Sequence, residues 1–127
     1  MLANAMFGRA VISISTTDRL VAGTFMSEVV ATVGLILTIF LLARSGHHVV
    51  VPWAVGAYIG AAYFFTSSTS FANPAITIGR MFSDTFAGIA PSSAPGFIAA
   101  QLIGGALALG LVFWFAPRAK ETTVIRA

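Results

Sequence analysis

The chain has no cysteine and few charged residues. Of its 127 residues, only 9% are Asp, Glu, Lys or Arg. The absence of thiols excludes disulfides, cysteine nucleophiles and thiolate metal sites. The acidic residues are too scattered to form an acid–base pair, and no nucleophile or metal-ligand spacing is visible. These residues are Asp18, Glu28, Asp84 and Glu121. We therefore expect no enzyme, no cofactor and no metal site.

The basic residues are also dispersed. Lys and Arg number seven, for a net charge of +3, and no basic cluster of the nucleic-acid-binding kind is present. Nucleic acid is therefore not expected as a partner. The amino-terminal residues contain Arg9 and the Asp18-Arg19 pair, which do not fit a cleavable signal peptide.

Apolar residues dominate the chain. They make up 57% of it, and the mean hydropathy is +0.92, which is typical of membrane proteins. Residues 20–43, 49–65 and 96–116 are predicted to cross the membrane as helices, since about 20 apolar residues span a hydrocarbon core of roughly 30 Å. Residues 1–19 are predicted to be a surface segment, and residues 117–127 a polar tail. The sequence thus predicts an all-α membrane protein in contact with lipid.

Small residues recur at every fourth position in each predicted span. Such stripes let helix backbones approach closely in lipid, so we expect a tight bundle. The stripes are Gly23, Ser27 and Ala31, then Gly56 and Gly60, then Ala100, Gly104 and Ala108.

A polar stretch, residues 67–80, lies between the second and third spans. Asn73 is a favourable N-cap and Pro74 suits the first helical turn, so a helix is predicted to start here. It extends to about residue 83, which is roughly 15 Å of helix or half a crossing. We predict that residues 66–83 form a re-entrant loop and half-helix. A capped helix on an extracellular loop is the alternative.

Irregular backbone at membrane depth is tolerated only where protein buries it or where it lines a water-filled cavity. The start of a half-helix presents N–H donors and a partial positive charge, and the residues before it present carbonyl oxygens. Together they can replace water around a neutral solute and oppose cations. Asn73 is the side chain expected to contact that solute.

Two further features stand out in or beside the first span. Glu28 lies well inside it, where an ionisable group usually faces the bundle interior, so we predict that it supports the backbone of the re-entrant loop. The alternative is a carboxylate that reaches the interface. His47 and His48 favour a solvated turn over a metal or pH-sensing site.

The motif Asn73-Pro74-Ala75 between two spans resembles the aquaporin and glycerol-facilitator family, also called major intrinsic proteins. Phe25-x-x-Glu28-Val29-x-x-Thr32 is similar to the family's glutamate motif, and residues 101–105 are similar to the helix after the loop. The resemblance covers roughly residues 2–116. It implies a passive channel for water and small uncharged solutes in the cell (plasma) membrane, and a homo-oligomer, the tetramer of the family.

Members of this family carry two inverted halves, so residues 1–127 are expected to form a single half domain. Residues 2–8 resemble the connection between halves, which favours the second half, although residues 73–77 and 100–104 also resemble first-half motifs. One half supplies only one side of a pore. The chain could be a fragment, pair with a separate first half, or pair with a second copy in the opposite orientation.

The resemblance also implies a selectivity filter. In most second halves an arginine follows the Asn-Pro-Ala motif, but here that position is Ile76. The other filter positions fall near Ser70 and near Gly60 or Ala61, which are small. We expect a wider, less polar constriction that admits glycerol, urea or neutral metalloid hydroxides as well as water.

Arg80 lies one turn beyond Ile76, where it could place a cation at the outer mouth. It could equally snorkel or pair with Asp84. A function of a different class also remains open: a truncated or accessory membrane subunit that conducts nothing by itself.

Overall fold

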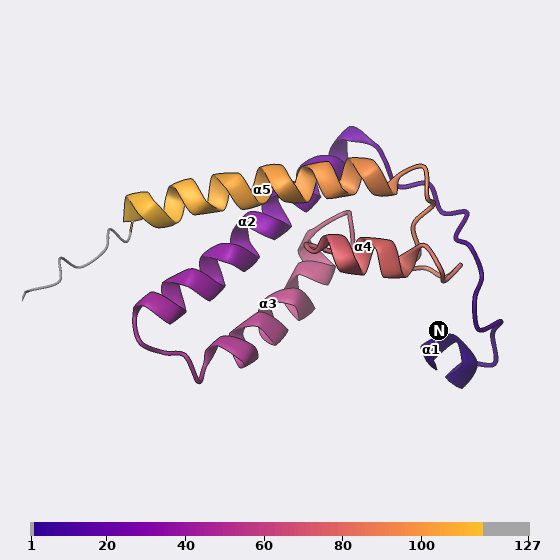
Figure 1. The fold of residues 1–127 in the computed structure, drawn as a ribbon, viewed down its shortest axis with the longest axis horizontal. Helices are drawn as coiled ribbons and strands as arrows, with labels where there is room; N and C mark the ends of the chain where they lie inside the picture. Colours follow the sequence, from indigo (N-terminus) through magenta and orange to yellow (C-terminus); the bar gives the residue numbers. More distant parts are fainter. Residues whose placement is uncertain (1, 116–127) are drawn as a thin grey trace, which may run out of the picture.

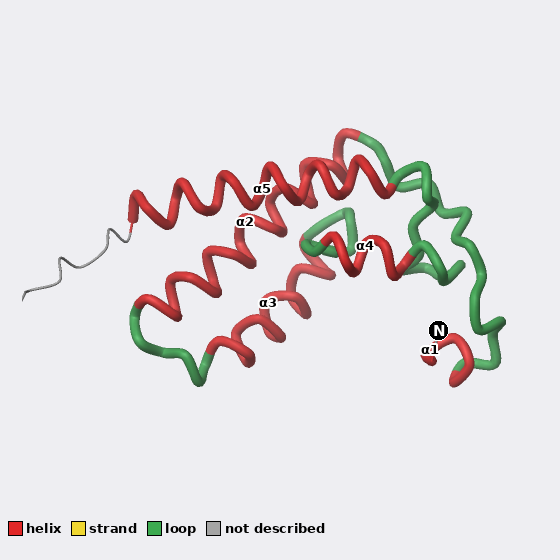
Figure 2. Tube along the Cα trace, viewed as in Figure 1, coloured by secondary structure: helices red, strands yellow, loops and turns green. Residues whose placement is uncertain are grey.

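A computed structural model describes residues 2–115 of the chain, and these residues form helices and loops without a β-strand (Figures 1 and 2). The helices are α1 (Leu2–Met6), α2 (Ala22–Arg44), α3 (Val51–Phe65), α4 (Pro74–Arg80) and α5 (Ala94–Phe115). The predicted tail, residues 117–127, lies outside the described residues, as does the last residue of the predicted span 96–116.

Two of the helices are long and apolar enough to cross a membrane. α2 has 23 residues and α5 has 22, which at about 1.5 Å per residue gives each a length above 30 Å. α3 is apolar but has only 15 residues, about 22 Å of helix. The described residues therefore form an all-α fold with two apolar helices of membrane-spanning length and a shorter apolar one.

α2 is the central helix of the arrangement, because it packs against both α5 and α3 (Figure 1). Along α5, Ala100 and Ala108 are fully buried, and a Cβ atom built on Gly104 would lie 2.7 Å from the Val29 carbonyl oxygen of α2. Ala31 of α2 is fully buried too. Small side chains thus allow the two long helices to approach closely.

The small residues in the rest of the predicted stripes do not bring helices together as predicted. Gly23, Gly56 and Gly60 have open space where a Cβ atom would lie, so they do not bring helices together within the described chain. The contact between α2 and α3 instead uses Gly34, which the predicted stripes did not include. The Tyr58 hydroxyl lies against Gly34 and donates a 3.0 Å hydrogen bond to the Ala31 carbonyl.

Residues 66–73 form the loop that leaves α3. α4 begins directly after this loop and packs against α5 (Figure 1). It has seven residues and ends at Arg80, shorter than the predicted helix to about residue 83. The Met81 and Phe82 N–H groups bond three residues back, to the Ile78 and Gly79 carbonyls, and this tighter turn ends the helix.

The segment between α1 and α2 lies along the connection that leads from α4 to α5. The Ser15 N–H donates to the Met81 carbonyl at 2.9 Å, and the Ala90 N–H donates to the Thr17 carbonyl at 2.8 Å. Ser15 is only 2% exposed. Much of the predicted surface segment 1–19 is exposed, but its second part is fixed by these backbone hydrogen bonds.

Candidate functional site

The loop between α3 and α4 folds back into the molecule, and residues 68–72 are buried. Thr69, Ser70 and Ala72 have φ angles of 63°, 46° and 50°, a left-handed conformation that residues other than glycine seldom adopt. Each such residue costs on the order of 1–3 kcal/mol unless its surroundings fix it. This loop therefore needs strong contacts to keep its shape.

The Glu28 carboxylate supplies those contacts from α2. It accepts hydrogen bonds from the Phe71 N–H at 2.8 Å and the Ala72 N–H at 2.9 Å. The Ser68 hydroxyl and the Gln101 side-chain amide donate to it at 2.8 Å each. Glu28 is fully buried, and four donors converge on it, as they do on a bound anion. Hydrogen bonds to a charged group contribute about 1.5–3 kcal/mol each, enough to offset the backbone strain.

Gln101 extends this network from α5 to α4. Its side-chain nitrogen also donates to the Thr77 hydroxyl at 2.9 Å, and that hydroxyl donates to the Asn73 carbonyl at 3.1 Å. Thr77 is fully buried. The start of α4 is thereby fixed to two helices through one continuous set of polar contacts, which we call the Glu28 network: Glu28, Ser68, Phe71, Ala72, Thr77 and Gln101.

The sequence predicts that Glu28 supports the loop. It predicts no contact for Gln101, which is part of the motif at residues 101–105. The parts played by Ser68 and Thr77 were missed. Both residues are polar and lie in or near the predicted re-entrant loop, which is the only sign of their role in the sequence. Local sequence does not indicate which of several hydroxyls faces a carboxylate on a distant helix.

Asn73 caps α4. Its side-chain oxygen accepts the Ala75 N–H at 2.8 Å, and its backbone is extended, with φ −157°. Because the oxygen is engaged, the side-chain nitrogen is the group left to donate a hydrogen bond outward, and the residue is exposed. Pro74 occupies the first helical position, where no N–H is needed.

The predicted filter residues differ in exposure. Ile76 is 41% exposed on α4, and Gly60 and Ala61 are exposed on α3. Ser70 is only 2% exposed, and its hydroxyl has no hydrogen-bond partner within the described residues. Because α4 packs against α5 and α3 packs against α2, the described residues do not by themselves close a constriction around these side chains.

Arg80 ends α4 and reaches across to α3. Its guanidinium donates to the Tyr63 hydroxyl at 2.6 Å and to the Ala87 carbonyl at 3.4 Å. The predicted alternative partner, Asp84, instead accepts from the Thr16 N–H at 3.0 Å. The guanidinium carbon also lies 4.4 Å from the centroid of the Phe71 ring.

Arg19, from the segment before α2, approaches the same ring. Its guanidinium carbon is 5.7 Å from the Phe71 centroid, and its Nε donates to the Gly88 carbonyl at 2.6 Å. Burial lowers the pKa of Arg19, and the nearby charge of Arg80 lowers that pKa further. Two guanidinium groups therefore lie close together at the carboxyl end of α4.

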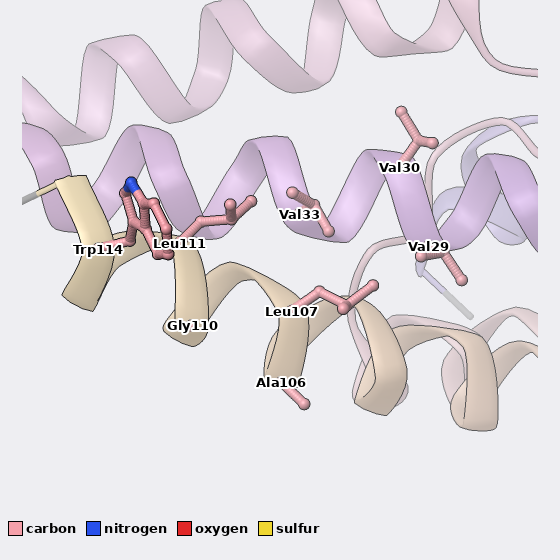
Figure 3. Close-up of a pocket in the computed structure, with 8 residues that line it drawn as sticks. All are labelled: Val29, Val30, Val33, Ala106, Leu107, Gly110, Leu111 and Trp114. Carbon is pink, nitrogen blue, oxygen red and sulfur yellow. The ribbon is translucent and has the colours of Figure 1, made fainter.

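The molecule also has apolar grooves. One, of about 640 Å³, runs between α2 and α5 and is lined entirely by apolar residues (Figure 3). These residues are Val29, Val30, Val33, Ala106, Leu107, Gly110, Leu111 and Trp114. Apart from the indole N–H of Trp114, the side chains of this surface offer a polar solute no hydrogen bonds. Polar chemistry is concentrated around the loop and α4 instead.

A second groove, of about 450 Å³, passes the start of α4 beside Ala72 and Pro74. Its wall includes Thr32 and Gln101, each 3% exposed. The Thr32 hydroxyl and the Gln101 side-chain oxygen have no hydrogen-bond partner among the described residues. This groove is therefore apolar at its surface, and two buried polar atoms lie behind its wall.

Comparison with known proteins gives one curated relative with a stated function. The chain is 45% identical, over 119 residues, to an aquaglyceroporin named AqpS from Rhizobium meliloti (strain 1021). The match covers 94% of this chain and 51% of the relative, so the chain spans about half the length of that protein. No protein-family model matches the chain, and no solved structure matches it.

The match extends over nearly the whole chain, and aquaglyceroporins are a family of channels, not of enzymes. The apolar helices agree with an integral membrane protein. Along nearly its whole length, the chain is therefore similar to about half of a member of the aquaporin, or major intrinsic protein, family.

Proposed function

We propose that this chain forms part of a passive transmembrane channel for water and small uncharged solutes. One observation carries the proposal: the buried Glu28 network holds a polar loop and the Asn73-capped start of α4 between two membrane-length helices. Irregular backbone at membrane depth is tolerated where protein buries it or where it lines a water-filled cavity, and the exposure of Asn73 at its end supports a cavity here. The relative is named an aquaglyceroporin, which supports the same class of solute.

The geometry at Asn73 suits a neutral, hydrogen-bonding solute. Its exposed amide nitrogen donates, and we infer that the preceding loop offers carbonyl oxygens as acceptors. A hydroxyl group of water or glycerol can use both. α3 then serves as the second span, and residues 66–80 as the re-entrant element at mid-membrane.

We place the constriction at Ile76, Ser70, Gly60 and Ala61. The two α3 positions carry small side chains with open space beside Gly60, and Ile76 brings no charge. A constriction built from these residues is wide and weakly polar. It suits glycerol, urea and neutral metalloid hydroxides in addition to water.

A complete pore needs more than the described half. The single half-helix α4 lines one side of a path, and the other side would come from a first half or from a second copy in the opposite orientation. We assign this chain to the second half. Assembly into tetramers in the plasma membrane follows the family pattern.

Flux measurements on proteoliposomes test the proposal. Vesicles that contain the full chain should shrink and swell in stopped-flow light scattering faster than empty vesicles, in both water and glycerol gradients. Ile76→Arg adds a long charged side chain at the constriction, so it should reduce glycerol flux several-fold more than water flux.

Fluxes equal to those of empty vesicles would contradict conduction by this chain alone and favour an accessory subunit. Co-reconstitution with a separately expressed first half would then show whether conduction requires that partner. Glycerol flux unchanged by Ile76→Arg in a conducting pore would remove Ile76 from the constriction.

A further inference from the structure

The Glu28 carboxylate lies directly beside the polar loop. The Glu28 carboxylate accepts four hydrogen bonds from the loop and from Gln101. Two of the donors are the N–H groups of Phe71 and Ala72. In a trans peptide the C=O group points opposite to the N–H group, so the carbonyl oxygens of Ser70 and Phe71 point away from Glu28.

This arrangement attracts cations. Carbonyl oxygens directed into a path are the groups with which membrane channels coordinate cations, and a buried carboxylate behind them strengthens the attraction. The start of α4 supplies only a partial positive charge against cations, and a fixed positive charge nearby would strengthen that opposition. Position 76, which begins the exposed face of α4, carries isoleucine and supplies none.

Arg80 has the charge and the position to do so. It lies four residues after Ile76, on the same face of α4. Its two hydrogen-bond partners, the Tyr63 hydroxyl and the Ala87 carbonyl, are uncharged, so neither neutralises the guanidinium. The short contact to Tyr63 joins α4 to α3, two helices that do not pack against each other within residues 2–115.

Phe71 contacts both Glu28 and Arg80. Its N–H group donates to Glu28 at 2.8 Å, and its ring lies under the Arg80 guanidinium at 4.4 Å. Arg19 adds a second guanidinium 5.7 Å from the same ring centroid. Aromatic faces hold cations at such distances, and Phe71 is 1% exposed, so the ring is a rigid support.

We propose that Arg80, held in place by Tyr63 and Phe71, is the residue that excludes cations from the polar loop, in place of a charge at position 76. Arg80 determines specificity, Tyr63 is a positioning residue, and Arg19 reinforces the field. This inference rests on the proposed channel function, because it assigns selectivity to the same path.

Paired flux measurements in proteoliposomes test this assignment. Glycerol flux is followed by light scattering, and proton and sodium leaks are followed by an internal pH dye and a sodium dye. Four variants are compared with the unaltered chain: Arg80→Ala, Arg80→Lys, Tyr63→Phe and Arg9→Ala. Arg9→Ala is the matched control, because it removes the same charge from an exposed residue of the amino-terminal segment.

Removing a unit charge a few ångströms from the path should raise cation leak at least about tenfold in Arg80→Ala, with glycerol flux retained. Arg80→Lys keeps the charge but not the planar fork, so its leak should be intermediate. Tyr63→Phe removes only the 2.6 Å contact and should also give a leak between those of the unaltered chain and Arg80→Ala. Arg9→Ala should match the unaltered chain.

Glycerol flux in each variant shows that the pore is still folded. If Arg80→Ala does not insert into the membrane, Tyr63→Phe provides a milder test, because it deletes only one hydroxyl. If Arg80→Ala and Tyr63→Phe conduct glycerol and remain as tight to protons and sodium as Arg9→Ala, the assignment is overturned. If the unaltered chain conducts no glycerol, alone or with a first half, the proposed function fails and the assignment fails with it. These two failures are distinguished by the glycerol flux of the unaltered chain.

Discussion

Two regions of the molecule bury their residues by different physical means. Where Ala31 of α2 and Ala100, Gly104 and Ala108 of α5 are buried, the two helices approach closely through small side chains. Around α4, the buried groups are polar, and Glu28 satisfies several of them at once. The first region depends on shape and the second on hydrogen bonds, so they should respond to different substitutions.

The largest effect is expected where the polar region loses its acceptor. Glu28→Ala leaves the Phe71 and Ala72 N–H groups and the Gln101 amide without their partner, and it also leaves the left-handed residues of the loop unsupported. We expect a loss of roughly 3–5 kcal/mol, as for the removal of one partner of a buried charged pair. Thermal unfolding in detergent, followed by circular dichroism, measures it.

Thr32→Val is the matched control for that substitution. Thr32 lies one turn from Glu28 on α2 and is equally buried, but its hydroxyl has no hydrogen-bond partner within the described residues. Its replacement should change stability by less than about 1 kcal/mol. If Thr32→Val destabilised the protein as much as Glu28→Ala, the special role of the carboxylate would be refuted.

A smaller effect is expected in the apolar region. A Cβ atom on Gly104 would lie 2.7 Å from the Val29 carbonyl oxygen and 2.9 Å from the Thr32 Cβ, so Gly104→Ala must push α2 and α5 apart. Overpacking of this kind costs typically 1–3 kcal/mol. The same unfolding measurement in detergent detects it.

The neighbouring glycine provides the control for this interface. A Cβ atom on Gly105 would meet only the Ile36 Cδ1, at 3.6 Å, which is an ordinary van der Waals contact. Gly105→Ala should therefore be neutral or slightly stabilising, since alanine favours helix more than glycine does. Equal losses for the two alanine variants would show that the helices are not in close contact at Gly104.

The helices of the fold follow from local sequence signals. Long apolar runs predict the membrane-length helices, and Asn73 followed by Pro74 predicts the start of α4. Such signals are local, because an N-cap or an apolar run acts on its own turn of helix. The predicted glycine stripe of α3 did not pack, since period alone does not indicate which face has a neighbour.

The contacts that shape the site could not be read from the sequence. Ser68 lies 40 residues from Glu28, and Gln101 lies 73 residues from it, so their pairing depends on the final arrangement of the helices. The left-handed conformations of Thr69, Ser70 and Ala72 run against residue preference and exist because the carboxylate stabilises them. Tertiary contacts override local preference here.

In the proposed channel, the α4 region borders water within the membrane and the α2–α5 groove does not. Because the chain has no cysteine, a single introduced thiol reports on its own site. Ile76→Cys and Leu107→Cys place thiols at residues that are 41% and 53% exposed, so exposure alone favours the second.

Reaction of these two variants in proteoliposomes with a membrane-impermeant maleimide is the direct test. The cysteine thiolate is the nucleophile that adds to the maleimide double bond, and it forms readily only in contact with water. We predict that Ile76→Cys reacts at least about tenfold faster than Leu107→Cys and that its modification lowers glycerol flux. Equal rates, or a faster reaction at position 107, would show that the α4 region does not border water more than the α2–α5 groove does.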